Sequence, residues 1–430
     1  MLFVSNIVFL IIFLVSIFIF SKEMSRIRYN ISLGKDINRY GNKKQRWVQM
    51  FKVAFGQTKM VARPIAGLLH VIIYSGFLII NIELIEIIID GIFGTHRILS
   101  FLGIVYNFLI ASFEILAFLV LIVCIIFLTR RNIIKIKRFI SSEMKGWPKL
   151  DANLILIFEI FLMSAFILMQ ASDLALQNIN YPHYIKAGSF PVSKFLLPLF
   201  QDLNPEKIYF FERFFWWFHI IGIFLFLNYL PYSKHLHIIF AFPNTYYSNL
   251  NPKGQFENME SVKQEVLAMI NPNNQNPPSS DDIKFGAKDV NDLNWVQLMN
   301  SYSCTECGRC TSECPANFTG KKLSPRKIMM DTRDRLEEFS KNISLGKSDN
   351  KSLLGDYISK EEIWACTSCN ACTQACPINI DPLSIILDLR RYCVMEESSA
   401  PSELNMMFNN IENNGAPWQF ASSDRLNWKE

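Results

Sequence analysis

The sequence predicts an all-α protein, in which a five-helix transmembrane bundle over residues 1–242 precedes a helical soluble domain. Half of the 430 residues are hydrophobic and 36 are phenylalanine, yet the apolar runs stop near residue 242. Beyond that point the chain is rich in Asn, Pro, Ser and charge. Nine of the ten cysteines lie after residue 300, so the second half also differs in its chemistry. The net charge of +5 is modest and gives no indication of nucleic-acid binding.

Five stretches are long and apolar enough to cross a bilayer, which takes about 20 residues of helix. They are residues 2–20, 65–89, 100–128, 152–172 and 208–230. The first stretch is followed by polar, basic residues without a small-residue cleavage site, which indicates a retained anchor rather than a signal peptide. After the last stretch, residues 243–290 are rich in Pro, Asn and Ser around the amphipathic segment MESVKQEVLAMI, which indicates a linker with one helix.

The loops differ in their content of Lys and Arg, which predicts the orientation of the bundle. The loops 21–63 and 129–149 are dense in these residues, whereas 90–99 and 173–207 hold few. The positive-inside rule therefore places the N-terminus outside and the soluble half in the cytoplasm. We expect a multi-pass protein of a bacterial-type cytoplasmic membrane.

Three of the six histidines fall in or just after the fifth span. If its helix continued to His237, eighteen residues at about 100° each would put His219 and His237 on one face, about 27 Å apart. His235 would lie roughly 160° away and is expected to be interfacial. Pro231 could kink this helix. Two histidines on one face at different depths could serve as ligands to cofactors held inside a helix bundle. The alternative interpretation is that they make polar contacts within the bundle.

Ionisable groups inside the spans are costly and often mark proton or quinone paths. They are Glu83, Glu86, Glu114 and Glu159. Glu83, Glu86 and the nearby Asp90 lie toward the outer side, where a quinol could release protons. Interhelical hydrogen bonds are the alternative interpretation. The histidines of the outer loops, His96 and His183, are expected to serve no cofactor.

The strongest motif, C-x2-C-x2-C-x3-C-P, occurs twice in the soluble half. Thiolates two residues apart on a tight loop can bind different irons of one [4Fe-4S] cube, and the fourth cysteine reaches the other cube. The predicted ligands are Cys304, Cys307, Cys310 and Cys376 for one cluster and Cys366, Cys369, Cys372 and Cys314 for the other. A zinc site would need a single set of four ligands. Clusters assemble under reducing conditions, which agrees with a cytoplasmic domain.

Each cysteine run is followed by a segment with the signals of a helix start. Ser324-Pro325 and Asp381-Pro382 each place a capping side chain before a proline in the first helical turn. The pattern predicts an internal duplication over residues 291–396, with a tail over 397–430. The two remaining cysteines, Cys124 in a span and Cys393 after a helix, are expected to be inert packing residues.

The segment FFWWFHIIGIFLFLNYLPYSKHLH resembles the fifth helix of the cytochrome b, or gamma, subunit of respiratory nitrate reductases and of related membrane subunits of heterodisulfide reductases and sulfite-reductase-linked complexes. GLLHVIIYSGF around His70 resembles the second helix of that family. The resemblance implies that His70 and His237 clamp a b-type haem, with His219 as a ligand of an outer haem. The second ligand expected on helix two is missing, because position 80 is Ile80. One haem is therefore expected, and His219 would have an unusual partner such as Met163 or contact a quinone.

The cysteine runs resemble the α-helical ferredoxin domain of succinate dehydrogenase iron–sulfur subunits. They resemble more closely the small iron–sulfur subunits of heterodisulfide reductases and of anaerobic glycerol-3-phosphate dehydrogenases. The resemblance implies a cytoplasmic α-helical ferredoxin domain with two [4Fe-4S] clusters. Larger relatives continue into a domain with CCG repeats, which these 430 residues do not contain, so a separate cytoplasmic redox protein with such repeats is expected as the partner. The aromatic tail with Trp418, Phe420 and Trp428 would dock it, or fold back on the domain.

Together, the motifs and resemblances predict a membrane-anchored electron-transfer subunit, without a catalytic residue of its own. It would pass electrons between the quinone pool and the cytoplasmic partner through one b haem and two [4Fe-4S] clusters. A haem-free membrane anchor that tethers a cytoplasmic oxidoreductase is the alternative. A redox-driven ion transporter is less favoured, because few buried acids form a chain across the bilayer.

Overall fold

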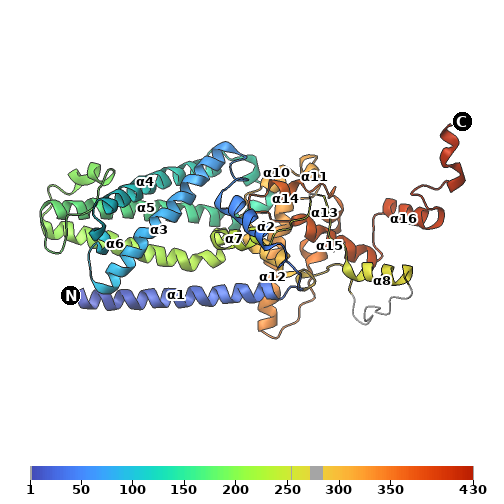
Figure 1. Ribbon diagram of the computed structural model, residues 1–430, viewed down its shortest axis with the longest axis horizontal. Coiled ribbons are helices and arrows are strands. Elements are labelled where there is room, and N and C mark those ends of the chain that lie inside the picture. The colour runs from blue at the N-terminus through green and yellow to red at the C-terminus, as the bar shows by residue number, and fades with distance from the viewer. Residues whose placement is uncertain (1, 253, 272–283, 430) are drawn as a thin grey trace. The chain divides into compact units, whose positions relative to one another are not determined.

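The computed structural model describes residues 2–252, 254–271 and 284–429 (Figure 1). Over these residues the chain forms helices joined by turns, with two isolated bridges and no strand, so the all-α prediction is confirmed. The chain divides into two compact units. The first comprises Met1–Tyr29, Asn42–Tyr246 and Tyr302–Gly308, and the second comprises Asn30–Gly41, Tyr247–Ser301 and Arg309–Glu430.

Five helices of the first unit are long and apolar enough to cross a membrane, as predicted. They are α1 (Leu2–Ser32), α3 (Pro64–Phe93), α4 (Ile104–Asn132), α5 (Trp147–Asn178) and α6 (Pro205–Tyr229). Most extend past the predicted spans, because polar residues at their ends continue the helical hydrogen bonding. In α1 the helix runs twelve residues beyond the predicted boundary at residue 20. Pro64 and Pro205 start their helices, where a missing N–H costs nothing.

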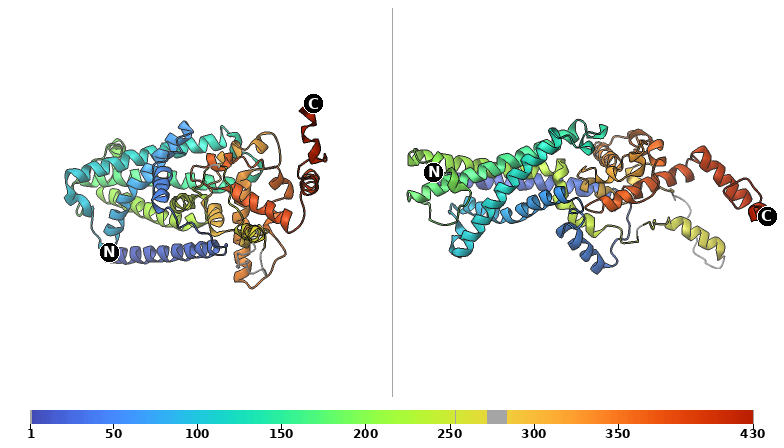
Figure 2. Two further views of the ribbon diagram at one scale, coloured as in Figure 1. Left: turned by 45° about the vertical axis from the view of Figure 1, so that its right-hand side comes forward. Right: turned by 90° about the horizontal axis from the view of Figure 1, so that it is seen from above.

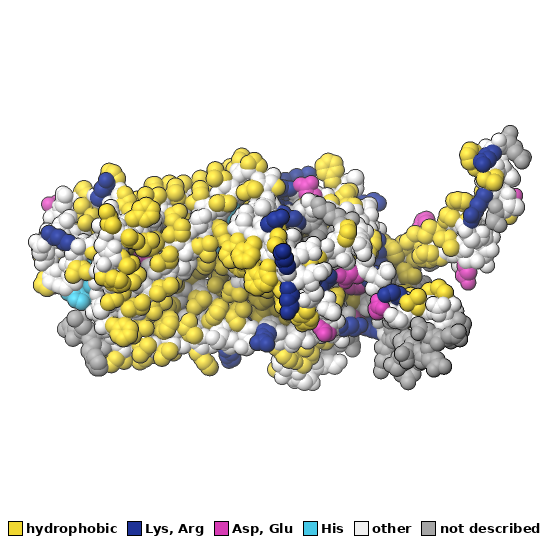
Figure 3. Space-filling model, viewed as in Figure 1, with side chains coloured by type: hydrophobic (Ala, Val, Ile, Leu, Met, Phe, Trp, Pro, Cys, Tyr) yellow, Lys and Arg dark blue, Asp and Glu magenta, His cyan; other side chains and the backbone are white. Residues whose placement is uncertain are grey.

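Neighbouring long helices run antiparallel to one another and pack around an apolar core. Helix α5 lies between α4 and α6, and α3 packs against α4 (Figures 1 and 2). Phe113, Phe166 and Ile220 are among the fully buried core side chains. The outer faces are apolar as well: Phe108 is 73% exposed, and Figure 3 shows hydrophobic side chains covering the visible face of the long helices. An apolar core with an apolar exterior is what a helix bundle needs in lipid.

Short helices and turns complete the chain. The remaining α-helices are α2 (Lys43–Met50), α7 (His237–Tyr246), α8 (Glu260–Ile270), α9 (Trp295–Ser303), α10 (Arg309–Ser312), α11 (Pro315–Phe318), α12 (Pro325–Ser344), α13 (Lys360–Trp364), α14 (Ala371–Ala375), α15 (Pro382–Met395) and α16 (Ser402–Asn414). A single π-helical turn covers Phe51–Phe55, the turn Leu353–Tyr357 has non-helical backbone at Leu354 and Gly355, and the other short turns are 3-10 helical.

The chain breaks after α6, so the continuous helix through His237 used to place the histidines is wrong. Helix α6 ends at Tyr229, and Pro231 lies in the 3-10 turn Leu230–Tyr232. Ser233 is extended, with φ −113° and ψ 159°, and its hydroxyl accepts a hydrogen bond of 3.1 Å from the His235 amide. A second 3-10 turn then leads into α7. Proline cannot donate to the preceding turn, which explains why the helix stops here.

The second unit is organised by the two predicted capped helices, which are confirmed. Ser324 caps α12 by accepting a hydrogen bond from the Lys327 amide at 3.4 Å, and Asp381 caps α15 through the Ser384 amide at 3.2 Å. The two helices pack against each other. The amphipathic segment of the linker forms α8, whereas linker residues 272–283 lie outside the described residues. Cys124 and Cys393 are buried, as expected for packing residues.

Candidate metal and cofactor sites

Three histidines meet where α3 begins and α6 ends, and we call His70, His235 and His237 the histidine group. The ring centroids of His70 and His237 are 6.5 Å apart, and those of His235 and His237 are 5.6 Å apart. Two imidazoles bound at about 2 Å to opposite sides of one metal ion would have ring centroids about 6 Å apart. The structure therefore brings His70 and His237 to a separation that suits a shared metal centre.

The ring of His237 is held in a defined orientation. Its Nδ1 lies 3.1 Å from the carbonyl oxygen of Lys234, which leaves Nε2 as the atom available to a ligand. Burial lowers the pKa of His237 and lowers that of His235 to about 3, so both imidazoles are in the neutral form that binds metals. The ring of His235 packs 5.2 Å from that of Phe226, and its expected interfacial position stays a prediction.

His219 lies apart from the histidine group, in the packed middle of α6. It is 3% exposed, its Nδ1 is 3.0 Å from the carbonyl oxygen of Leu162, and its ring is 5.5 Å from Phe166. One turn further on, a Cβ added to Gly222 would come within 2.6 Å of Leu162 Cδ2. Helices α5 and α6 are thus in close contact beside His219, and apolar side chains surround it.

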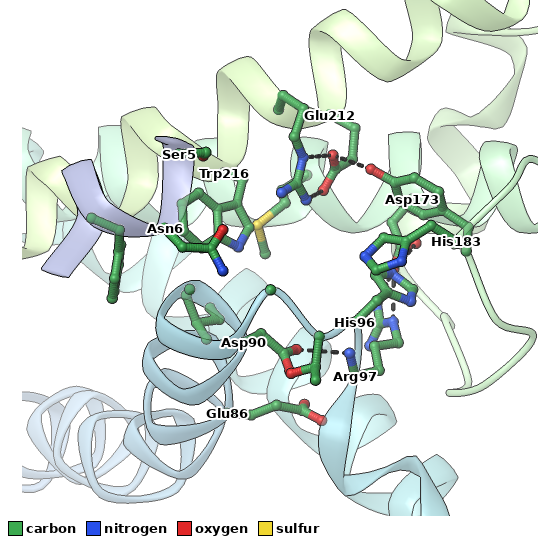
Figure 4. Close-up of a pocket in the computed structure, with 18 of the residues that line it drawn as sticks. Ser5, Asn6, Glu86, Asp90, His96, Arg97, Asp173, His183, Glu212 and Trp216 are labelled. Carbon is green, nitrogen blue, oxygen red and sulfur yellow. Dashed lines mark hydrogen bonds and ion pairs between the residues drawn. The ribbon is translucent and has the colours of Figure 1, made fainter. Parts of the chain in front are cut away.

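A polar cavity of ≈ 80 Å³ lies at the opposite end of the bundle, where α1 begins (Figure 4). Helices α1, α3, α5 and α6 and two loops line it. The buried Arg97 bridges its walls: Nε donates to Asp173 Oδ2 at 2.7 Å, one Nη to the Tyr106 hydroxyl at 3.0 Å, and the other to Gln170 Oε1 at 2.5 Å. The other carboxylate oxygen of Asp173 is 3.1 Å from His96 Nε2. Asp173 raises the pKa of Arg97 although burial opposes it, so the guanidinium stays charged.

The sequence reasoning missed this network, although it singled out several of the acids around it. Arg97 counted only as a loop charge, and Asp173 lies one residue beyond the predicted fourth span. The available signal was an Arg, an Asp and a Gln at helix ends within an otherwise apolar half of the chain. His96, expected to serve no cofactor, hydrogen-bonds to Asp173 and lies 6.0 Å from the ring of His183.

The two cysteine runs share one backbone pattern. In each run, the residues two and four positions after the first cysteine have positive φ: Glu306 at 55° and Gly308 at 71°, and Ser368 at 55° and Asn370 at 62°. These conformations curl the chain so that successive cysteines can face a common centre. The same two left-handed positions in both runs support the predicted duplication at the level of the backbone.

The second unit contains the third and fourth cysteines of the first run and the whole second run, together with donors that suit thiolates. Short helices α10 and α14, which carry Cys310 and Cys372, pack against each other. The Ser368 amide lies 3.4 Å from the Cys366 sulfur, and the Ile380 amide lies 3.3 Å from the Cys376 sulfur. Such N–H donors stabilise the charge of cluster-bound sulfur. All ten cysteines are described, and none forms a disulfide.

Lys234 connects two of these features within the first unit. Its carbonyl oxygen holds His237, as described above, and its buried ammonium group donates to Glu306 at 2.5 Å and to the Pro148 carbonyl at 2.6 Å. Glu306 lies between Cys304 and Cys307 in the first cysteine run. One residue thus contacts both the histidine group and the loop that begins the first cysteine run.

Comparison with known proteins defines the class to which this arrangement belongs. The family model of the 4Fe-4S dicluster domain matches residues 303–380, which contain all eight cysteines of the two runs. The iron–sulfur part of the prediction is therefore confirmed. The chain is a membrane-associated iron–sulfur protein, related to electron-transfer oxidoreductases.

Three relatives are informative. The chain is 30% identical over 419 residues to a probable iron-sulfur-binding oxidoreductase FadF of Bacillus subtilis, covering 89% of this chain and 54% of the relative. It is 26% identical to the EtfAB:quinone oxidoreductase of Syntrophomonas wolfei, over 91% of this chain and 55% of the relative. A 100-residue stretch, 23% of this chain, is 34% identical to half of a ferredoxin/F420H2-dependent CoB-CoM heterodisulfide reductase subunit of Methanosarcina acetivorans. The chain spans about half the length of the first two relatives, and no solved structure matches it.

Proposed function

We propose that the protein carries electrons between a quinone in the membrane and a cytoplasmic redox partner. One b-type haem would be held by His70 and His237, and two [4Fe-4S] clusters by the eight cysteines of the two runs. The observation that carries the haem proposal is the pair of facing imidazoles, with ring centroids 6.5 Å apart, at the end of the bundle. When bound, haem and clusters each accept and release one electron at a time.

The chain's own residues would prepare these sites before any cofactor binds. The Lys234 carbonyl orients His237, while α3 presents His70 from the facing wall. The ammonium group of Lys234 ties the loop of Cys304 and Cys307 to the same end of the bundle through Glu306. This contact keeps the loop of Cys304 and Cys307 near the histidine group. Amide donors to Cys366 and Cys376 would stabilise their thiolates.

A single haem is proposed because the described residues around His219 supply no equivalent partner ring. Its contacts on α5 are the Leu162 carbonyl and the Phe166 ring. At the position on α3 where a second ligand would be expected, the chain has Ile80 followed by Asn81, whose side-chain amide donates to the Phe77 carbonyl of the same helix. Met163 as a ligand to a second haem remains an untested prediction.

The quinone is inferred from a relative, and the partner from the resemblance of the cysteine runs to heterodisulfide reductase subunits. One relative is described as an EtfAB:quinone oxidoreductase, and another belongs to a heterodisulfide reductase. We infer that this chain also exchanges electrons with a quinone, and that its partner is a cytoplasmic protein with CCG repeats. The orientation with the N-terminus outside remains the prediction from the loop charges. Purification through a tag on this chain tests the partner: a CCG-repeat protein supports it, and a flavoprotein alone contradicts it.

Reduced-minus-oxidised spectra of the purified full chain test the haem site. The wild type should show a b-type α-band, and His70→Ala and His237→Ala should each abolish it. His235→Phe keeps an aromatic ring of similar size, and His219→Ala removes the histidine of the bundle middle, so both should retain the band. Persistence of the band in His70→Ala would overturn the ligand assignment. A wild type without the band, but with about eight irons per chain, would favour the haem-free anchor.

The cluster ligands are tested by iron content and electron paramagnetic resonance. Cys372→Ser should remove or convert one cluster and leave the signal of the other. Cys393→Ser, at a buried cysteine outside the motifs, is the matched control and should retain both signals. Loss of a cluster in the control, or two intact clusters in Cys372→Ser, would contradict the assignment.

A further inference from the structure

The polar cavity contains more carboxyl groups than cations. Five acids line it, against two arginines. The acids are Glu83, Glu86, Asp90, Asp173 and Glu212. Asp173 pairs with Arg97, and Glu212 pairs with Arg213 and accepts a hydrogen bond from the Tyr184 hydroxyl at 2.6 Å. Three carboxyl groups therefore lack an arginine of their own in a largely desolvated site.

Two of these three acids are satisfied by neutral donors. Asp90 accepts from the Arg97 amide at 2.7 Å and from the Thr95 hydroxyl. Glu86 accepts from the Leu99 amide and the Tyr106 hydroxyl, each at 2.9 Å. Both carboxylates thus have donors on each oxygen, as buried ionised groups require. In Figure 4, Glu86 and Asp90 lie beside the loop that carries His96 and Arg97, and Glu212 and Trp216 form the opposite wall.

Glu83 is the exception. It is 3% exposed and lines the cavity, one turn of α3 before Glu86. The Gln170 side-chain amide donates to its Oε1, but its Oε2 is buried and has no hydrogen-bond partner among the described residues. An ionised carboxylate with one bare oxygen costs several kcal/mol in such a site, whereas a protonated one becomes a donor to a water. The cavity of ≈ 80 Å³ exceeds several times the roughly 15 Å³ that one water needs.

We propose that this cavity is a hydrated proton-exchange site, in which Glu83 takes up and releases a proton between the bundle interior and the aqueous phase at the α1 end. The role rests on the proposed function. Oxidation of a quinol yields a quinone, two electrons and two protons; the electrons leave through the redox centres, and the protons leave by way of Glu83 and the cavity waters. Quinone reduction runs the same exchange in reverse.

The groups that face Glu83 support reversible proton binding. From the same helix, Glu86 adds negative charge, and from α4 Glu114 does the same. Arg97, fixed by Asp173, supplies positive charge from the loop, and Gln170 donates from α5. The polar residues of α1 at this cavity, Ser5 and Asn6, are uncharged, and the α6 acid, Glu212, is neutralised by Arg213. Arg97 therefore favours the ionised form of Glu83, whereas burial, Glu86 and Glu114 favour the protonated form.

Labelling with a lipophilic carbodiimide, which reacts with protonated carboxyl groups in apolar surroundings, tests the proposal without any cofactor. The full chain in membranes is treated at neutral pH, and the labelled residue is found by tandem mass spectrometry. We expect label on Glu83, its loss in Glu83→Gln, and its retention in Glu159→Gln. Glu159 is the matched control, because it is an intramembrane glutamate on α5 that does not line the cavity. A wild type in which Glu159 is labelled and Glu83 is not would overturn the proposal.

Infrared difference spectra between two pH values give the second readout. The wild type should show the carbonyl stretch of a protonated carboxylic acid that decreases as pH rises and shifts in D2O. Glu83→Gln should lack this band and Glu159→Gln should keep it. An unchanged band in Glu83→Gln would contradict the proposal. The proposed function fails separately: a missing haem α-band with the carboxyl band intact removes the electron route but leaves the proton site.

Discussion

Titratable side chains gather at both ends of the helix bundle. The two ends differ in the groups they offer: imidazoles at one end and carboxyl groups at the other. At the histidine group, His237 Nδ1 lies 3.1 Å from a backbone carbonyl oxygen, and burial lowers the pKa of His235 and of His237. Neutral imidazole is a common metal ligand, so this end suits a metal centre. At the polar cavity, arginines and neutral donors satisfy four of the acids, and among the described residues one carboxylate oxygen of Glu83 has no donor. That end suits the exchange of protons.

The largest effect is expected from removing the central cation of the polar cavity. Arg97→Met leaves Asp173 buried without its partner and removes the donors to Tyr106 and Gln170. Removing one partner of a buried ion pair lowers the free energy of unfolding by about 3–5 kcal/mol. Denaturation of the full chain in detergent should show this loss in the free energy of unfolding.

Two variants serve as controls for this prediction. Arg97→Lys keeps the charge but not the planar fork of donors, so a smaller loss is expected. Combining Arg97→Met with Asp173→Leu removes both charges. The double variant should lose at least about 1 kcal/mol less free energy of unfolding than the sum of the two single losses. Strict additivity of the two substitutions would show that Arg97 and Asp173 do not act as a pair.

At the other end of the bundle, Lys234→Met tests whether the histidine end depends equally on its buried cation. Lys234 is 9% exposed and donates to Glu306 and to the Pro148 carbonyl. Burial lowers the pKa of Lys234, so less electrostatic stabilisation is lost with it than with Arg97. A cost of about 2–3 kcal/mol is expected in the same denaturation measurement. A cost greater than that of Arg97→Met would reverse the ranking of the two ends.

A smaller effect is expected in the middle of the bundle, which separates the two ends. Gly222→Ala adds a Cβ that would lie 2.6 Å from Leu162 Cδ2, so either the Leu162 side chain or the two helices must shift beside His219. Overpacking of this kind costs about 1–3 kcal/mol. The double variant Gly222→Ala with Leu162→Ala relieves the clash and should show favourable coupling of at least about 0.5 kcal/mol. Absence of coupling would mean that the helices accommodate the methyl group elsewhere.

The smallest effect is expected from Glu83→Gln. If Glu83 is protonated, the amide keeps the hydrogen bond from Gln170 and replaces a hydroxyl donor with an N–H donor. The free energy of unfolding at neutral pH should then change by less than about 1 kcal/mol. A loss of free energy of unfolding comparable to that of Arg97→Met would show that Glu83 is ionised. Glu83 would then not differ in protonation from the other acids of the cavity.

Much of the fold could be predicted from local sequence patterns. The apolar runs predicted the five long helices because each span needs only its own length and composition. The two Ser-Pro and Asp-Pro signals predicted α12 and α15, because a cap acts within one turn of helix. The cysteine spacing predicted the iron–sulfur domain, because the ligands of one loop lie within ten residues of one another.

Features that depend on several distant segments could not be predicted. The network of Arg97 joins Tyr106, Gln170 and Asp173, and no local pattern indicates that these residues meet. The contact between His235 and His237 was not predicted, for a related reason. A helix places residues two apart on nearly opposite sides, whereas the extended Ser233 and the following turn bring the rings of His235 and His237 within 5.6 Å.

The length of α3 between His70 and Glu83 also has an electrical consequence. Thirteen residues of helix span about 20 Å, which is about two thirds of a hydrocarbon core of roughly 30 Å. If electrons enter or leave near His70 and protons near Glu83, each turnover separates charge over that distance. A full crossing at 100 mV involves about 2.3 kcal/mol per elementary charge. Turnover in sealed vesicles should therefore respond to an imposed membrane potential, so that the bundle would act as a voltage-sensitive element as well as an anchor.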